Sequence, residues 1–260
     1  MGLKMFDLPP DGIQDGAVAK LDKEQSTSTE VKPQIVTEQV SPDDPIKKKV
    51  KMPDGATYPE GSEEYERIVK EYKQILKYKK MIKFVYQNKP LGTGDAVLKT
   101  KKYIKDKFFL MLLPDDLIIK KNCSKSMIKI HRRYKSSVMA SMNVNKKTVS
   151  RWGIFKLNKK LDRNNYLIKD VVEKPSIASA PSNKAVIGRY ILPNKIFSKL
   201  SKLKPGKGGE IHITDAIQSL IYDNNKFIAH NFSGKYLDCG SMNGYIKSTL
   251  EIAKSWSYVW

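Results

Sequence analysis

The sequence predicts an α/β protein whose strands form a mostly parallel sheet. From residue 81 onward, short apolar runs typical of strands alternate with segments whose apolar residues recur at helical spacing. The run "FFLMLL" (108–113) is apolar enough for the middle of a sheet covered on both faces. Such alternation is typical of α/β folds, whose ligands bind at the carboxyl ends of the strands. The first predicted strand is "MIKFVYQ" (81–87).

Composition divides the chain into three parts. Residues 1–60 are rich in Asp, Glu, Ser, Thr, Pro and Gly. This composition predicts a disordered acidic tail, because it buries too little apolar surface to offset chain entropy. Within 61–80, apolar residues spaced three and four apart predict an amphipathic helix over 63–79, with Ser62 as its cap. Residues 81–260 carry the predicted sheet.

Charge is distributed unevenly between the two ends of the chain. Residues 1–70 hold 10 Lys and Arg against 14 Asp and Glu, whereas the remaining 190 residues hold 38 against 13. A basic excess suits nucleic acid, phosphorylated small molecules or acidic lipid, although lysines on solvated faces explain it equally well. Nucleic-acid binding is the weaker interpretation, because no aromatic stacking platform interleaves the lysines.

The sequence carries no sign of export or of a membrane span. Its two cysteines lie far apart, so no disulfide framework is expected. The N-terminus lacks an apolar core of signal-peptide length, and the longest apolar run is too short to cross a bilayer. We therefore expect a soluble, cytoplasmic protein without a membrane partner.

Three aspartates suggest a magnesium site. Asp115 and Asp116 follow the buried run, where its carboxyl end reaches the ligand cleft. Carboxylates there suit Mg²⁺, which takes hard oxygen ligands and bridges to phosphate. Asp238 follows a predicted strand and can supply the second carboxylate that shares this ion with Asp115. The alternative is that each of these aspartates is a turn or cap residue, which is common wherever a strand ends.

A glutamate–lysine pair ends another predicted strand, in "VVEKP". The carboxylate of Glu173 can hold vicinal hydroxyls while the ammonium of Lys174 meets a phosphate, which together describe a sugar phosphate. The alternative is a surface ion pair that contributes almost nothing. Gly92-Thr93-Gly94 lacks the third glycine of the dinucleotide fingerprint.

Seven segments, taken in order, resemble the bacterial UTP–glucose-1-phosphate uridylyltransferases over roughly residues 76–254. They are "QNKPLGTGDAVL", "FFLMLLPDDLII", "SRWGIF", "VVEKP", "AVIGRYIL", "GGEIHITDAI" and "YLDCGSMNGYIK". The resemblance implies a Rossmann-like nucleotidyltransferase fold. It also implies an enzyme that transfers UMP from UTP to glucose 1-phosphate, giving UDP-glucose and pyrophosphate, in a family that commonly forms homo-oligomers.

The same resemblance implies roles for individual residues. Asp115 and Asp238 would hold Mg²⁺, Glu173 would bind glucose hydroxyls, and Lys174 would bind the phosphate of glucose 1-phosphate. Lys174 and Asp115 are therefore the expected catalytic residues.

Four further residues are implied as substrate contacts. Gln87 would read the uracil edge, with Gly92 letting the base lie against the backbone. Gly153 and Gly188 would offer backbone contacts to the sugar.

The sequence departs from the family at its start. The family opens with a strand and a glycine-rich loop that wraps the triphosphate, and residues 1–75 resemble neither. We therefore expect an N-terminally incomplete nucleotidyltransferase domain over 81–260, with a sheet edge left open where the strand is missing. Loss of one such cationic group costs on the order of a hundredfold or more in rate, so a chain without the whole loop is expected to be nearly inactive alone. A nucleotide-sugar-binding remnant without turnover is thus the main alternative.

Overall fold

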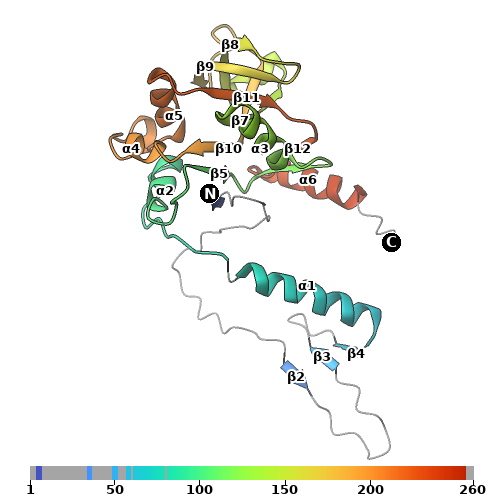
Figure 1. Cartoon of the computed structure of the whole chain (residues 1–260). Coiled ribbons are helices and arrows are strands. Elements are labelled where there is room, and N and C mark those ends of the chain that lie inside the picture. The colour runs from blue at the N-terminus through green and yellow to red at the C-terminus, as the bar shows by residue number, and fades with distance from the viewer. Residues whose placement is uncertain are drawn as a thin grey trace, which may run out of the picture. The chain divides into compact units, whose positions relative to one another are not determined.

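The structure is a computed structural model that describes residues 4–7, 34–36, 49–51, 57–59, 61–79 and 81–255. The described residues fall into two compact units, and the larger one combines the strand near the N-terminus with the chain from Phe84 onward. The elements of the larger unit, in chain order, are β1 (Lys4–Asp7), α2 (Thr93–Lys99), β5 (Phe108–Leu112), β6 (Asp116–Ile119), α3 (Cys123–Tyr134), β7 (Ser137–Asn143), the 3-10 helix η1 (Lys146–Arg151), β8 (Gly153–Lys160), β9 (Asn165–Glu173), β10 (Lys184–Pro193), α4 (Ile196–Leu200), the 3-10 helix η2 (Lys207–Gly209), α5 (Ile213–Tyr222), β11 (Phe227–Asn231), β12 (Lys235–Asp238) and α6 (Met242–Ser255) (Figure 1).

The main sheet is mixed, so the prediction of a mostly parallel sheet is wrong. Its seven strands follow the order β1-β5-β10-β7-β11-β9-β8. Among the described strands only β7 and β11 pair in parallel. The reason lies in the connections: parallel neighbours need a long crossover, usually a helix, whereas β8, β9 and β10 follow one another without an α-helix and pair antiparallel.

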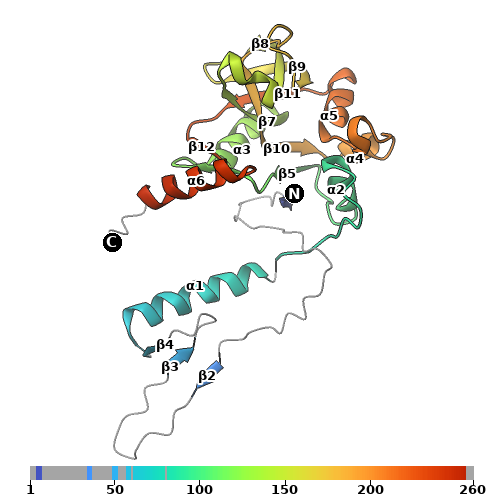
Figure 2. The same ribbon diagram turned by 180° about the vertical axis from the view of Figure 1, so that it is seen from behind.

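The core lies on both faces of this sheet because neighbouring residues of β5 point to opposite sides. Phe109 and Met111 pack with residues of α2, α4 and α5 on one face. Leu110 packs with residues of α3 on the other face. Both views place α4 and α5 together at one end of the unit and α6 at the opposite end (Figures 1 and 2).

A second, two-stranded sheet brings two distant segments together. β6 pairs antiparallel with β12, and this register sets Asp116 opposite Asp238. Asp115 immediately precedes β6, and α6 begins four residues after Asp238. The β6–β12 ladder therefore holds the segments that carry the three candidate carboxylates, Asp115, Asp116 and Asp238.

The smaller unit confirms the predicted helix. α1 spans Glu63–Lys79, and the Ser62 hydroxyl accepts the Tyr65 backbone N–H at 3.2 Å. A three-stranded antiparallel sheet precedes it, made of β2 (Gln34–Val36), β3 (Lys49–Lys51) and β4 (Thr57–Pro59). These strands and β1 are the described parts of 1–60; the rest of the predicted tail lies outside the described residues.

Two local expectations at the N-terminal side of the domain are wrong. Residues 82–87 form no strand, and Phe84 and Tyr86 are exposed. The sheet edge expected to be open is occupied, because β1 pairs antiparallel with β5, which pairs with β10 on its other side. With both edges of β5 taken, residues 82–87 find no partner strand there. Within the described part of the chain, no helix has the length and apolar character needed to cross a bilayer.

Candidate active site

Asp115 and Asp238 lie side by side at the end of the small sheet. The backbone N–H of Cys239 donates to the carbonyl of Asp115 at 2.8 Å. A Cβ built on Gly240 would stand 2.9 Å from Asp115 Oδ2 and 3.4 Å from Asp238 Oδ1. The two carboxylates therefore converge on the backbone of Gly240, which has room for them because it carries no side chain.

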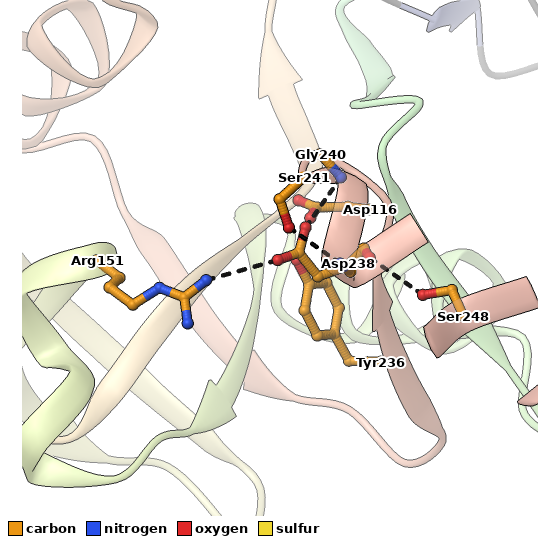
Figure 3. A network of polar contacts seen from close by, with 8 residues as sticks. Asp116, Arg151, Tyr236, Asp238, Gly240, Ser241 and Ser248 are labelled. Atoms are coloured by element: carbon orange, nitrogen blue, oxygen red, sulfur yellow. Dashed lines mark hydrogen bonds and ion pairs between the residues drawn. The ribbon is translucent and has the colours of Figure 1, made fainter. Parts of the chain in front are cut away.

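The two carboxylates differ in how they are satisfied. Asp238 Oδ1 accepts the Gly240 N–H at 2.9 Å, and its Oδ2 lies 3.7 Å from Nη2 of Arg151 (Figure 3). Asp115 Oδ1 is buried and has no hydrogen-bond partner among the described residues. A buried, unpartnered carboxylate oxygen is costly, so the geometry suits a cation that would complete it.

Asp116 has a structural role behind this pair. Its side chain accepts the Gly188 N–H at 2.6 Å. It also accepts the Tyr236 hydroxyl (Figure 3). Burial raises the pKa of Asp116 above its ordinary value, while these two hydrogen bonds act in the opposite direction. Of the two adjacent aspartates, Asp116 joins β6 to β10 and β12, which leaves Asp115 for a ligand.

Gly188 is enclosed by protein atoms. Its N–H donates to Asp116, and its carbonyl accepts the Leu113 N–H at 2.8 Å and Nη1 of Arg189 at 3.1 Å. A Cβ at this position would overlap Asp116 and approach Leu113 Cβ to 2.6 Å. Close packing therefore explains this glycine, and its N–H is already committed to a partner other than a sugar.

Glu173, Lys174 and Gly153 form one group at the end of β9. Gly153 pairs with Glu173 across the β8–β9 ladder, and a Cβ on Gly153 would stand 3.1 Å from Glu173 Oε2. Lys174 has a φ of 44°, in the left-handed region that non-glycine residues rarely adopt. Its N–H donates to the carbonyl of Trp152 at 3.0 Å. Backbone conformations of this kind cluster at ligand sites.

Three consecutive residues connect this group to the carboxylates. Arg151 pairs with Asp238, the Trp152 carbonyl accepts the Lys174 N–H, and Gly153 lies opposite Glu173. The Trp152 ring also meets the ring of Tyr236 edge-on, with centroids 5.7 Å apart. The segment 151–153 thus joins the predicted sugar-phosphate residues to the predicted metal residues.

Gln87 and Gly92 form a separate group. The Gln87 amide donates both to the Gly92 carbonyl at 3.1 Å and to Asp95 Oδ2 at 2.7 Å. Gly92 has a φ of 92°, and a Cβ there would stand 2.8 Å from the Ile211 carbonyl. Tight packing on Ile211 therefore requires this glycine, while Gln87 is held in a fixed orientation.

Sequence reasoning missed several residues of the site. Arg151 and Tyr236 make contacts with partners about 90 and 120 positions away in the chain, which no local pattern signals. Asp95 is 4% exposed and fixes the Gln87 amide. The signal available in the sequence was an acidic residue in the first turn of a predicted helix, directly after Gly92-Thr93-Gly94.

Comparisons with known proteins agree on one family. The family model described as Nucleotidyl transferase matches residues 51–255, a match that begins earlier than the resemblance over 76–254. A UTP–glucose-1-phosphate uridylyltransferase of Pseudomonas aeruginosa is 36% identical over 169 residues, covering 64% of this chain and 60% of the relative. Another, from Streptococcus pyogenes serotype M1, is 37% identical over 175 residues, covering 65% and 58%. The chain therefore spans about 60% of the length of these relatives.

Solved structures give the same picture. A crystal structure of UDP-glucose pyrophosphorylase complexed with UDP-glucose is 37% identical, with a TM-score of 0.64 over 72% of this chain and 73% of that one. An apo UDP-glucose pyrophosphorylase, also 37% identical, gives a TM-score of 0.69 over 75% and 71%.

Proposed function

Because this chain belongs to the nucleotidyl transferase family, we propose that its site transfers UMP from UTP to glucose 1-phosphate, giving UDP-glucose and pyrophosphate. One observation carries the proposal. The converging carboxylates of Asp115 and Asp238 are linked through residues 151–153 to the Glu173–Lys174 pair. The names of the relatives, and the UDP-glucose bound to one structural neighbour, support this substrate class.

The reaction asks the protein for positioning and charge neutralisation. An oxygen of the sugar phosphate attacks the α-phosphorus of UTP, and the bond from that phosphorus to pyrophosphate breaks. The attacking oxygen is already anionic, so no general base is needed. Lys174 would neutralise the sugar phosphate and hold it in line, and Glu173 would fix the hydroxyls of the glucose ring.

Asp115 and Asp238 would hold a divalent cation. Mg²⁺ is commonly bound by one or two carboxylates, with waters and substrate phosphates completing its ligands. The two convergent carboxylates and the unpartnered Asp115 Oδ1 fit that pattern. When bound, the cation supplies charge neutralisation at the phosphate oxygens.

Gln87 would select the base. Its NH₂ group donates to Gly92 and Asp95. The part of the amide that remains for a ligand is therefore Oε1, which is a hydrogen-bond acceptor. Uracil presents an N–H at ring position 3, which would donate to this oxygen, whereas cytosine presents an acceptor there. Asp95 thus supports selection of uracil over cytosine by preventing the amide from turning over.

The test combines turnover with binding. Pyrophosphate release from UTP, glucose 1-phosphate and Mg²⁺ measures turnover. Thermal unfolding with and without UDP-glucose plus Mg²⁺ measures binding, since a ligand at a hundred times its Kd adds about 2.7 kcal/mol of stability. We expect both signals in the wild type and neither in Glu173→Gln, which keeps the size of the side chain. Absence of any UDP-glucose-dependent shift in the wild type would refute the proposal.

A second candidate is nucleotide-sugar binding without turnover. It is favoured by the sequence, in which residues 1–75 do not resemble the glycine-rich triphosphate loop of the family. It predicts a thermal shift with UDP-glucose but no pyrophosphate release, so the same two measurements separate the candidates.

A further inference from the structure

We infer that Arg151 is an exchangeable counter-ion for Asp238: it pairs with this carboxylate when no cation is bound and turns toward a phosphate-bearing ligand when one is. The inference rests on the proposed function, because it takes Asp115 and Asp238 as the cation ligands. It assigns to Arg151 a positioning role that follows from charge and exposure.

The Arg151–Asp238 pair is loosely held. The distance between Nη2 and Oδ2 is 3.7 Å, beyond hydrogen-bond range. The Arg151 side chain is 63% exposed, and it reaches Asp238 from η1, on the side away from Gly240 (Figure 3). Exposed ion pairs of this kind are worth little. The guanidinium can therefore leave Asp238 at small cost.

A pocket beside the pair offers Arg151 a second position. It has a volume of about 600 Å³ and is formed by η1, β12 and α6. Its lining includes Arg151, Asn243 and Lys247. The lining residue Lys235 pairs with Glu251 at 2.5 Å, whereas Lys247 has no ion-pair partner among the described residues. Arg151 and Lys247 therefore give the pocket positive charge, and Asn243 adds a side-chain amide donor, a combination that suits a phosphate group.

The charge balance drives the exchange. Without a cation, the carboxylates of Asp115 and Asp238 carry two negative charges against the single positive charge of Arg151. A divalent cation neutralises both carboxylates, so the attraction that holds Arg151 disappears. The guanidinium then lies next to a cation and is favoured only where a phosphate supplies new negative charge.

Binding of Mn²⁺ tests the first half of this exchange. Loss of free Mn²⁺ in electron paramagnetic resonance titrations would be compared for the wild type, Arg151→Ala and Lys147→Ala. Lys147 is exposed on the same 3-10 helix, so its variant removes an equal charge without touching Asp238. We expect Arg151→Ala to bind Mn²⁺ about two- to fivefold more tightly, the range that an exposed ion pair supports. Lys147→Ala should match the wild type.

Binding of UDP-glucose at saturating Mn²⁺ tests the second half. Here Arg151→Ala should weaken the affinity, by at least about fivefold if the guanidinium bonds a phosphate. The UDP-glucose affinity of Arg151→Lys should fall between those of the wild type and Arg151→Ala. Tighter binding of Mn²⁺ together with weaker binding of UDP-glucose in Arg151→Ala would indicate exchange. A variant that merely distorts Asp238 would weaken the binding of both ligands.

Each remaining outcome overturns the inference. Weaker binding of both ligands in Arg151→Ala, with an unchanged melting temperature, would show that Arg151 only orients Asp238. Unchanged affinity for both would show that it does nothing here. If the wild type and Asp238→Asn both leave Mn²⁺ free, the carboxylates are not a cation site, and the proposed function fails together with this inference.

Discussion

Replacing Gly188 by alanine should destabilise the larger unit strongly. The new methyl group would overlap the Asp116 carboxylate and stand 2.6 Å from Leu113 Cβ, in a buried position of β10. Relieving this overlap costs about 1–3 kcal/mol as overpacking. Moving Asp116 away also breaks its bond with the Gly188 N–H, a hydrogen bond to a charged group worth about 1.5–3 kcal/mol. Together the loss should be about 2.5–6 kcal/mol.

Urea unfolding followed by circular dichroism measures this loss. With an m-value of about 2 kcal/mol per molar urea, the midpoint should fall by roughly 2 M. Gly153→Ala is the matched control, because the atom nearest to its Cβ would be the flexible carboxylate end of Glu173 at 3.1 Å, and the next two lie at ordinary contact distances of 3.4 and 3.6 Å. That variant should lose less than about 1 kcal/mol. In an Asp116→Ala background, Gly188→Ala should cost less than it does alone, since part of the overlap is gone.

A shift of under about 0.5 kcal/mol for Gly188→Ala would refute the packing argument, because that is the scatter of neutral surface changes. Equal costs in the wild-type and Asp116→Ala backgrounds would refute the specific contact with Asp116.

Three further predictions concern other parts of the larger unit. Lys174→Asn should keep the free energy of unfolding within about 0.5 kcal/mol, because asparagine tolerates positive φ, yet abolish the UDP-glucose-dependent rise in melting temperature; a retained rise would exclude Lys174 as the phosphate ligand. Cys239 should react with a thiol reagent at pH 7.5 well before Cys123, since burial raises the pKa of the Cys123 thiol to about 12; mass spectrometry of the labelled peptides reads the order. Burial lowers the pKa of His230, so the unfolded chain binds a proton first as the pH falls below about 6.5, and stability should decline in that range. Urea midpoints at pH 7.5 and 5.5 should therefore converge in His230→Gln, and an unchanged difference would assign the decline to other groups.

Local structure was predictable where one segment contains its own signals. The helix at 63–79 follows from apolar spacing and a serine cap, and both are present in α1. The strand within "FFLMLL" was recognisable because six consecutive apolar residues need burial on both faces, and β5 has its three central residues buried. Residues 81–87 ("MIKFVYQ") are also mostly apolar and predicted a strand, but a strand needs a free partner, and that depends on distant parts of the chain.

The sequence suggested some residues of the candidate site but not the contacts that hold them together. The sequence suggested Asp115 and Asp238 as partners because each comes near the end of a predicted strand, and the family resemblance implied the same pair. What brings the two segments together is the antiparallel β6–β12 ladder, which no local pattern announces. Strand directions were not predictable, since they depend on whether a helix or a tight connection joins successive strands. The Arg151–Asp238 contact was hidden for a similar reason: an ion pair between η1 and β12 leaves no periodic trace in the sequence.

The segment 151–153 has a consequence for how the two halves of the site respond to ligands. Its three residues lie against Asp238, Lys174 and Glu173 in turn, so release of Arg151 from Asp238 acts on a segment whose next two residues are fixed to Lys174 and Glu173. Any factor by which a sugar phosphate alters cation affinity must be matched by the same factor in the reverse direction. Trp152 is the middle residue of this segment, between Arg151, which pairs with Asp238, and Gly153, which lies opposite Glu173. A conservative change such as Trp152→Phe should therefore reduce the mutual dependence of the two ligands more than the affinity for either one alone.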